Sequence, residues 1–462
     1  KNQIILILFS LSIFLSYTSI FNFEFRFLYL LIFGFLVFDS SFLKEISIRV
    51  KITSILILFF LSCYSILLYF FHFNEIGIFN LVKNDLKSKH ILEVLFQSGI
   101  IGLTFLIVSF YIKFITTNLT KIIDYFVYIF VFLILLYNFK NSGILLDLLF
   151  QCKLGFFYYT NYLFDESSHF AIISVPVLMS FIYNIEFYIK KKITFFLYIA
   201  FAIFAFGNFS LSFYLTLVSS IIIIFLCCKN LSKVSKFLFI TLLIISTIFL
   251  FQGNKTSSFD YEQIKITNTN CKIATTTKTK NNKQDWFEGG REEGLVKLGS
   301  LFKKQNSNLS TSIYIYSLYV AKNSVLKYPL GVGIKNYTHF RSYLDQSIVI
   351  DWTETLKGEI KFKESYMPIL PGVILQFNLH SGSNNFSKLV VEFGFLGLVL
   401  LLLIFIYCFS NQIDDMVKVV VITLIFSQLF IRGTGFFNSG FLISIIIMIT
   451  LIMNIISNKN IK

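Results

Sequence analysis

The sequence predicts an all-α, polytopic membrane protein with about twelve transmembrane helices, and three observations support this fold class. Of the 462 residues, 56% are apolar and only 14% are charged, whereas a soluble domain carries about 25% charged residues. The mean hydropathy is +0.74, and long apolar runs recur along the chain. Because one bilayer crossing takes roughly 20 apolar residues, the length allows about a dozen crossings and one large loop.

Apolar runs and the breaks between them predict the individual spans. In chain order these cover residues 3–20, 26–43, 52–71, 91–112, 122–138, 169–187, 193–206, 209–228, 237–251, 386–409, 419–432 and 440–457. No small-residue cleavage site follows the first run, so we expect it to be a span and not a removed signal peptide.

The net charge of +15 is explained by topology and does not call for a nucleic-acid partner. Fifteen Lys and Arg residues fall in the loops on one side of the predicted layout, and six fall in the short loops on the other side. Cytoplasmic loops carry the excess of basic residues. We therefore expect both termini in the cytoplasm and the long segment 252–385 outside it.

These spans divide the chain into three parts: an N-terminal bundle of about nine spans (1–251), a large outer loop between spans 9 and 10 (252–385), and a C-terminal bundle of about three spans (386–462). Within the loop, residues 309–326 alternate apolar and polar side chains at near-helical spacing. They predict an amphipathic helix that lies on the membrane or on the bundle.

The cysteines predict no metal site, because none has CxxC or zinc-ligand spacing. Only Cys152 and Cys271 fall outside the predicted cytoplasmic and membrane segments, so a disulfide between them stays open. We find no internal repeat of the kind that marks many transporters.

Two polar segments stand at the outer ends of predicted spans. Glu166 and His169 come directly before the sixth span, where they form either an acid/base or sugar-binding cluster or a capped helix start. Arg432, at the end of the eleventh span, is either a clamp for an anionic group or a residue that snorkels to the interface.

A third segment follows the predicted helix in the outer loop. Pro329, Gly331 and Gly333 predict a tight turn, and Lys335 follows it. Exposed backbone N–H groups with a nearby lysine can hold phosphate, although a purely structural turn has the same pattern. Arg341 lies just beyond, and arginine binds phosphate bidentately.

A fourth segment leads into the tenth span. His380, Ser383 and Asn384 precede Lys388 and Glu392, which are four residues apart on one predicted helix face. The spacing favours an ion pair that enters the membrane as a unit. Glycines close behind permit tight helix packing.

The order and sidedness of these segments resemble the superfamily of bacterial O-antigen polymerases and O-antigen ligases. The resemblance is carried by Glu166-Ser-Ser-His-Phe, Tyr328-Pro-Leu-Gly-Val-Gly-Ile-Lys-Asn-Tyr, Ser383-Asn-Asn…Glu392-Phe-Gly-Phe-Leu-Gly and Arg432-Gly-Thr-Gly-Phe-Phe. Ligases typically show His-Asn where the spacing to Glu392 aligns Ser383-Asn384, and the serine here argues against the ligase. The segments at 166 and 432 look more like the polymerase branch.

The resemblance implies a GT-C-like membrane glycosyltransferase of lipopolysaccharide biosynthesis in the bacterial inner membrane, with a periplasmic active site. It would transfer the growing glycan from undecaprenyl diphosphate to the terminal sugar of a new lipid-linked repeat unit, with inversion. No metal and no cofactor are implied. Membrane lipid surrounds both substrates, and a chain-length-regulating co-polymerase is a further expected partner.

The resemblance also implies residue roles. The expected catalytic base is His380, with Glu166 or His169 as second choice. The expected diphosphate ligands are Arg341, Arg432 and Lys335. The expected substrate-binding residues are Asn384, Ser383, Tyr337 and Glu392. Ligation to lipid A–core and transport of a lipid-linked oligosaccharide by a flippase stay open as alternatives.

Overall fold

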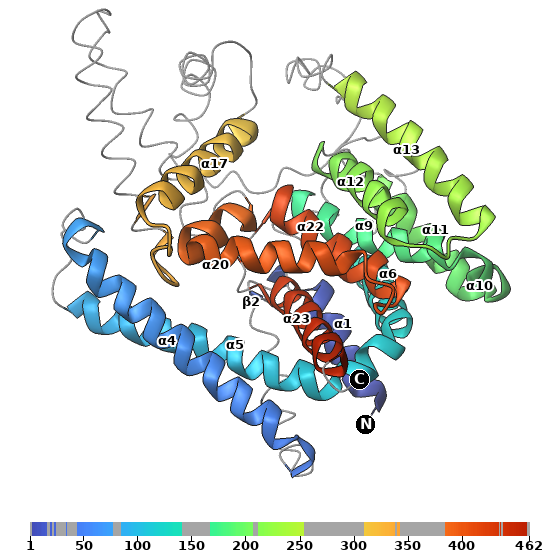
Figure 1. The fold of residues 1–462 in the computed structure, drawn as a ribbon. Coiled ribbons are helices and arrows are strands. Elements are labelled where there is room, and N and C mark those ends of the chain that lie inside the picture. Colours follow the sequence, from blue (N-terminus) through green and yellow to red (C-terminus); the bar gives the residue numbers. More distant parts are fainter. Residues whose placement is uncertain are drawn as a thin grey trace, which may run out of the picture.

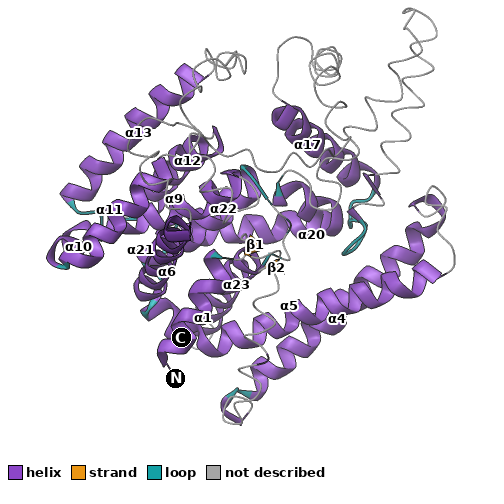
Figure 2. Cartoon of the chain, turned by 180° about the vertical axis from the view of Figure 1, so that it is seen from behind, coloured by secondary structure: helices purple, strands orange, loops and turns teal. Residues whose placement is uncertain are grey.

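The computed structural model is almost entirely helical, as Figure 2 shows. It describes residues 2–15, 19–20, 23–24, 34, 44–76, 85–140, 167–206, 211–253, 309–337, 340–341, 384–433, 435 and 438–459. Within these ranges the strands are the short β1 (Ser19–Ile20) and β2 (Phe23–Glu24), which pair antiparallel. The predicted all-α class is confirmed.

The helices follow the predicted spans closely (Figure 1). They are α1 (Asn2–Phe14), α4 (Ile48–Ile76), α5 (Asp85–Thr117), α6 (Leu119–Lys140), α9 (Ser167–Tyr183), α10 (Ile185–Lys190), α11 (Lys192–Phe206), α12 (Leu211–Cys227), α13 (Lys233–Gly253), α17 (Leu309–Lys327), α20 (Asn385–Cys408), α21 (Asp415–Val417), the π-helix η2 (Lys418–Ile422), α22 (Thr423–Phe430) and α23 (Ser439–Lys459). Of the predicted spans, only 26–43 has no described helix, because it lies outside the described residues apart from Gly34.

Five of these helices are long and apolar enough to cross a membrane: Ile48–His72, Ile91–Thr117, Lys233–Leu250, Asn385–Cys408 and Ser439–Ser457. Shorter apolar helices occupy Asn2–Phe14, Ser168–Tyr183, Lys192–Phe206 and Ser212–Cys227. This set of helices is typical of a membrane protein. The number of twelve crossings and the cytoplasmic placement of the termini stay predictions.

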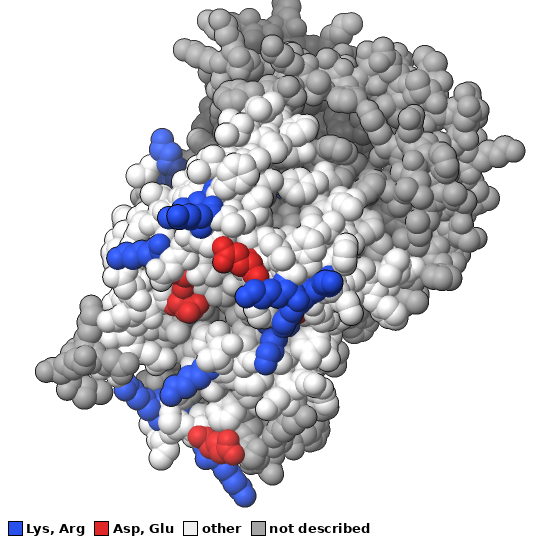
Figure 3. All heavy atoms as spheres, turned by 90° about the vertical axis from the view of Figure 1, so that its right-hand side faces the viewer, with Lys and Arg blue, Asp and Glu red and all other residues white. Residues whose placement is uncertain are grey.

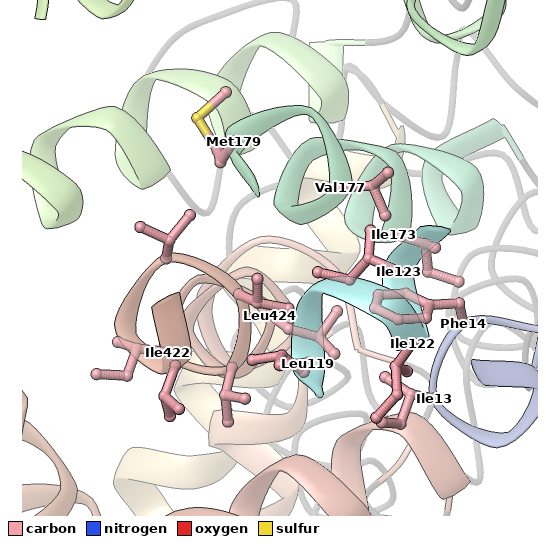
Figure 4. Close-up of a cluster of buried hydrophobic side chains, with 14 of the residues drawn as sticks. Ile13, Phe14, Leu119, Ile122, Ile123, Ile173, Val177, Met179, Ile422 and Leu424 are labelled. Atoms are coloured by element: carbon pink, nitrogen blue, oxygen red, sulfur yellow. The ribbon is translucent and has the colours of Figure 1, made fainter. Parts of the chain in front are cut away.

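Helix α9 lies at the centre of the bundle because it is apolar on all sides. Every described residue from Phe170 to Ile182 is buried, and the helices α11, α12, α22 and η2 pack around it. Figure 4 shows the interior that results, with Phe14 of α1, Ile122 of α6, Ile173 of α9 and Leu424 of α22 directed into one apolar cluster.

The periphery of the molecule is apolar as well. Helices α4 and α5 lie side by side along one edge of the bundle, and α13 lies at the opposite edge (Figure 1). Large apolar side chains of both edges are exposed, among them Phe59 and Phe71 of α4 and Phe237 of α13. Such surfaces suit lipid acyl chains and not water.

Basic side chains gather at one end of the bundle, as the positive-inside rule leads us to expect. Residues Lys190–Lys192 and Lys229–Lys236 contribute exposed lysines to this end. The Ser235 hydroxyl donates to the Ile182 carbonyl at 2.8 Å, which holds the first turn of α13 against the end of α9. Figure 3 views the molecule from the right-hand side of Figure 1, and basic groups outnumber acidic ones there.

The predicted helix at 309–326 is confirmed as α17, and it lies on the bundle against α20 (Figure 1). Small residues form most of the buried face, namely Ser317, Ala321 and Ser324 together with Val320. Leu318, one of the apolar residues that predicted this helix, is exposed instead. Small side chains let the two helices approach closely.

A buried carboxylate ties three helices together near the basic end. The hydroxyls of Tyr188 and Tyr198 donate to Asp124 Oδ1 at 2.8 and 2.9 Å, from α10 and α11 to α6. All three side chains are buried. A carboxylate in such a place has to be satisfied by hydrogen bonds.

Replacing Tyr198 with phenylalanine is therefore expected to destabilise the fold by about 1–3 kcal/mol, since one donor to a buried charge is lost. Thermal unfolding of the detergent-solubilised protein measures this effect. The matched control is Tyr125→Phe, because the Tyr125 hydroxyl of the same helix α6 makes no hydrogen bond within the described residues. Equal melting temperatures for the two variants would contradict this role of Asp124.

Candidate functional site

Helix α20 is interrupted at Gly394, where φ is 54° and ψ is −133°. Only glycine adopts this backbone conformation without strain. A Cβ at this position would also overlap the Pro329 carbonyl oxygen. The interruption leaves backbone groups on both sides of Gly394 without their helical partners, inside a helix of membrane-spanning length.

The turn after α17 supplies the missing partners. The N–H groups of Val332 and Gly333 donate to the carbonyls of Val391 and Glu392, each at 2.9 Å. The Phe395 N–H donates in turn to the Pro329 carbonyl at 2.8 Å. Irregular backbone at membrane depth is tolerated when protein satisfies it in this way.

The two glycines of the turn are required by their conformation and by space. Gly331 and Gly333 have φ of 85° and 89°. A Cβ on Gly331 would sit 2.5 Å from the Glu392 carbonyl oxygen, and one on Gly333 would sit 3.0 Å from the Ser65 carbonyl oxygen of α4. The Gly-x-Gly pattern therefore marks a close approach of three backbones.

The Glu392 carboxylate lies close to the backbone of this turn. Lys335 has φ of 71°, so left-handed residues alternate along 331, 333 and 335. The backbone N–H groups of Lys335 and Tyr337 lie near the Glu392 carboxylate, but neither carboxylate oxygen has a hydrogen-bond partner within the described residues. Phosphate binding by this turn, which the sequence suggested, stays a prediction.

The Lys335 side chain itself points to a different helix. Its Nζ lies 3.5 Å from Glu93 Oε2 of α5, and both side chains are more than one-third exposed. Helix α4 holds the same turn: the Tyr64 hydroxyl donates to the Leu330 carbonyl, and the Ile334 N–H donates to Ser65 Oγ at 3.1 Å.

Four polar side chains meet beneath the turn and are nearly inaccessible to solvent. Arg341 and Tyr337 are each 1% exposed, Lys388 is 8% exposed and Glu392 is fully buried. The Arg341 guanidinium and the Tyr337 hydroxyl interact, and the Glu392 charge acts on both Tyr337 and Lys388. We call these residues the buried charge cluster.

The groups of the buried charge cluster act on one another. Burial raises the pKa of the Tyr337 hydroxyl, Arg341 opposes this rise, and the Glu392 carboxylate adds to it. Tyr337 therefore stays neutral at pH 7. The Arg341 guanidinium lies against Tyr337, and Lys388 lies within electrostatic reach of the Glu392 carboxylate.

The start of α20 lies about two turns before Glu392, roughly 10 Å along the helix. Asn384 caps the helix, because its side chain accepts from the Ser387 N–H at 2.8 Å and donates to Ser317 Oγ of α17 at 3.1 Å. Asn385 Oδ1 accepts from the Gly435 N–H at 2.8 Å. This capping role explains why Asn384 is buried. The hydrogen bonds of the cap are made by the side-chain amide of Asn384, the group that was expected to bind substrate.

Arg432 belongs to this second region. Gly433, the next residue, packs so closely on Asn385 that a Cβ would overlap it. Arg432 thus lies beside the start of α20, whereas Lys335, Tyr337 and Arg341 lie beside Glu392. These four expected ligand-binding residues therefore lie along one helix, α20, with Arg432 near its start and the other three near Glu392.

The expected catalytic residues are described only in part. His169 is buried in the first turn of α9, and α9 packs against α22, the helix that ends just before Arg432. His380, Ser383 and Glu166 lie outside the described residues, as do Cys152 and Cys271. Most of the outer loop 252–385 also lies outside them.

Three contact residues of the turn escaped the sequence analysis, namely Tyr64, Ser65 and Glu93. They belong to α4 and α5, more than two hundred positions before the turn, and no local signal marks them. Among the described residues, no three His, Cys, Asp or Glu side chains come together as metal ligands.

No protein-family model, curated protein or solved structure matches the chain. The function therefore has to be argued from the buried charge cluster, the break in α20 and the membrane character of the helices.

Proposed function

We propose that this protein is an O-antigen polymerase, a metal-independent and inverting glycosyltransferase of the bacterial inner membrane. It transfers the growing glycan from undecaprenyl diphosphate to the terminal sugar of a new lipid-linked repeat unit at the periplasmic face. The observation that carries the proposal is the buried charge cluster, which holds Arg341 and Lys388, at a break in a helix of membrane-spanning length.

The chemistry of the donor explains the need for cations. Its leaving group is a diphosphate, which departs with its negative charge and needs no acid to protonate it. Guanidinium groups stabilise developing phosphate charge most strongly where water is excluded. Arg341 fits this task by its burial, and Arg432 and Lys335 supply further positive charge along the same helix.

The acceptor hydroxyl needs a base within hydrogen-bond reach. His380 is the proposed base, with His169 or Glu166 as second choice. Tyr337, Ser383, Asn384 and Glu392 complete the proposed substrate-binding set, Glu392 by holding the turn and Asn384 by holding the start of α20. A co-polymerase that sets chain length is a proposed partner.

The decisive experiment uses the purified protein in detergent with its lipid-linked repeat unit as sole substrate, followed by a gel. A ladder of lengthening lipid-linked chains supports the polymerase. Transfer only after lipid A–core is added would identify a ligase, and no transfer in either assay would favour a transporter.

In the same assay, Arg341→Gln is expected to reduce chain extension by about 100-fold or more, because a preorganised cation at the leaving group is removed. The control is Arg49→Gln, since Arg49 lies on α4 far from the turn and makes an exposed hydrogen bond to Ser457 Oγ at 3.1 Å. Both variants are first checked for native melting behaviour. Normal ladders from folded Arg341→Gln would remove Arg341 from the site.

A further inference from the structure

Two buried cysteines from distant parts of the chain meet at one end of the bundle. Cys227 is the last residue of α12, and Cys408 is the last residue of α20. Their thiols lie within hydrogen-bonding reach of each other, and both are free. Cys408 Sγ also lies 3.0 Å from the Ile404 carbonyl oxygen of its own helix, which fixes the direction of its side chain.

The packing of the helices explains why the two cysteines meet. Both α12 and α20 pack against α22, which brings their ends together. Lys418, the first residue of η2, donates to the Cys227 carbonyl at 2.9 Å and to Asp415 Oδ1 at 3.3 Å. The charge of its ammonium group acts on both thiols. Reactive cysteines are found beside such cations.

A buried cysteine by itself is a small apolar residue and indicates no chemistry. Cys63 of α4 is of this kind, since its sulfur makes no hydrogen bond within the part of the chain that the structure describes. Cys228 is as buried as Cys227, but its thiol donates to the Asp415 carbonyl at 3.8 Å. Cys227 and Cys408 differ from both because the two thiols face each other across two helices, as a disulfide requires.

Both cysteines lie at helix ends on the predicted cytoplasmic side. The loops that follow the predicted spans 209–228 and 386–409 contain Lys229 and Lys418, which belong to the larger group of basic loop residues. The cytoplasm keeps thiols reduced, and a disulfide that forms there is transient or senses oxidants. Two free thiols in contact suit the reduced state of such a pair.

The pair lies close to the surface of the protein. Cys227 is 6% exposed and Cys408 is 1% exposed. Residues just beyond them, Lys229 and Phe409, are exposed. Helix ends fray, so a small fluctuation there uncovers Cys227 before Cys408.

We propose that Cys227 and Cys408 form a site of reversible oxidation, at which a peroxide converts the two thiols into a disulfide that clamps the end of α12 to the end of α20. The Cys227 sulfur first takes one peroxide oxygen and becomes a sulfenic acid, while the other oxygen leaves as water with the thiol proton. The Cys408 thiol then attacks the Cys227 sulfur, the S–S bond forms, and a second water leaves. Two electrons pass from the sulfurs to the peroxide.

The disulfide is returned to two thiols by exchange with a reducing dithiol. Its position is at the opposite end of α20 from Asn385, where the helix begins. The inference therefore does not depend on the proposed function, and neither one fails with the other.

The test exposes the reduced, full-length protein in detergent to hydrogen peroxide. Remaining thiols are blocked with N-ethylmaleimide, and the peptides are mapped by mass spectrometry without reduction. We expect a cross-linked pair of peptides that joins the end of α12 to Cys408, and we expect dithiothreitol to separate it. The oxidised protein should also melt a few degrees higher than the reduced protein, because the cross-link restricts the unfolded chain.

Cys228→Ser is the matched control, because Cys228 is the neighbour of Cys227 and is equally buried. This variant should keep the cross-link and the rise in melting temperature, whereas Cys227→Ser and Cys408→Ser should lose both. Intrinsic fluorescence of the reduced variants first establishes that each is folded. The map of the unmutated protein stands as the test if a variant does not fold.

Four outcomes would overturn the proposal. They are the absence of the cross-link, its loss in Cys228→Ser, its formation at the same rate in protein unfolded by guanidinium, and a cross-linked protein that melts no higher than the reduced one. The third would show that the fold does not position the pair, and the fourth would show that the bond does not clamp the two helices.

Discussion

Gly394→Ala is expected to destabilise the protein by about 3 kcal/mol or more and to abolish chain extension. Two costs add, namely the strain of a left-handed backbone with a Cβ and the overlap of this Cβ with the Pro329 carbonyl. With both costs present, the turn at 328–337 cannot pack against the break at Gly394. A thiol-reactive dye measures unfolding, since Cys227, Cys228 and Cys408 are free and buried.

Gly99→Ala is the control for this variant. Gly99 lies inside α5, and a Cβ there would meet only Leu58 Cδ1 at 3.9 Å, an ordinary contact. Alanine favours helix over glycine by roughly 0.5–1 kcal/mol, so this variant should melt at the same temperature or higher. A Gly394→Ala protein with unchanged melting would show that the break in α20 is dispensable.

Glu392→Gln is the second variant with a large expected effect, a loss of about 3–5 kcal/mol. The amide keeps the shape of the side chain but removes the buried carboxylate whose charge acts on Lys388. The dye-monitored melting temperature should fall clearly. Adding Lys388→Met in the same chain should restore part of the loss, because the buried cation opposite Glu392 is removed as well.

Glu93→Gln provides the matched control. Glu93 also faces Lys335, at 3.5 Å, but both partners are partly exposed, and such pairs contribute about 1 kcal/mol at most. If Glu392→Gln and Glu93→Gln lowered stability equally, the charge of Glu392 would not be what holds the turn against α20.

The helices could be predicted from the sequence because their signals are local. A run of apolar residues long enough to cross a bilayer seldom forms anything other than a helix. Described helices occupy every predicted span except 26–43. The helix at 309–326 was predicted in the same way and is α17. Its orientation was not predictable from apolar spacing, because serines and alanine, and not leucine, face α20.

The candidate site was predictable in its parts but not in its assembly. Gly331 and Gly333 indicated a tight turn, and Lys388 and Glu392 indicated charges on one helix face. Nothing local indicated that N–H groups of the turn donate to the Val391 and Glu392 carbonyls, some sixty residues later. Asn384, expected at the substrate, also caps α20, a role that its place before a long apolar helix fits.

The sequence by itself determined the fold class, the positions of the helices and the gathering of basic residues in alternate loops, because bilayer thickness, helical periodicity and charge bias act on neighbouring residues. Only the tertiary structure decided that the turn at 328–337 fills the break at Gly394 and that α4 holds this turn through Tyr64 and Ser65. The physical reason is that a broken helix has to find backbone partners elsewhere in the chain. Which segment supplies them depends on packing over long distances, and no local propensity encodes it.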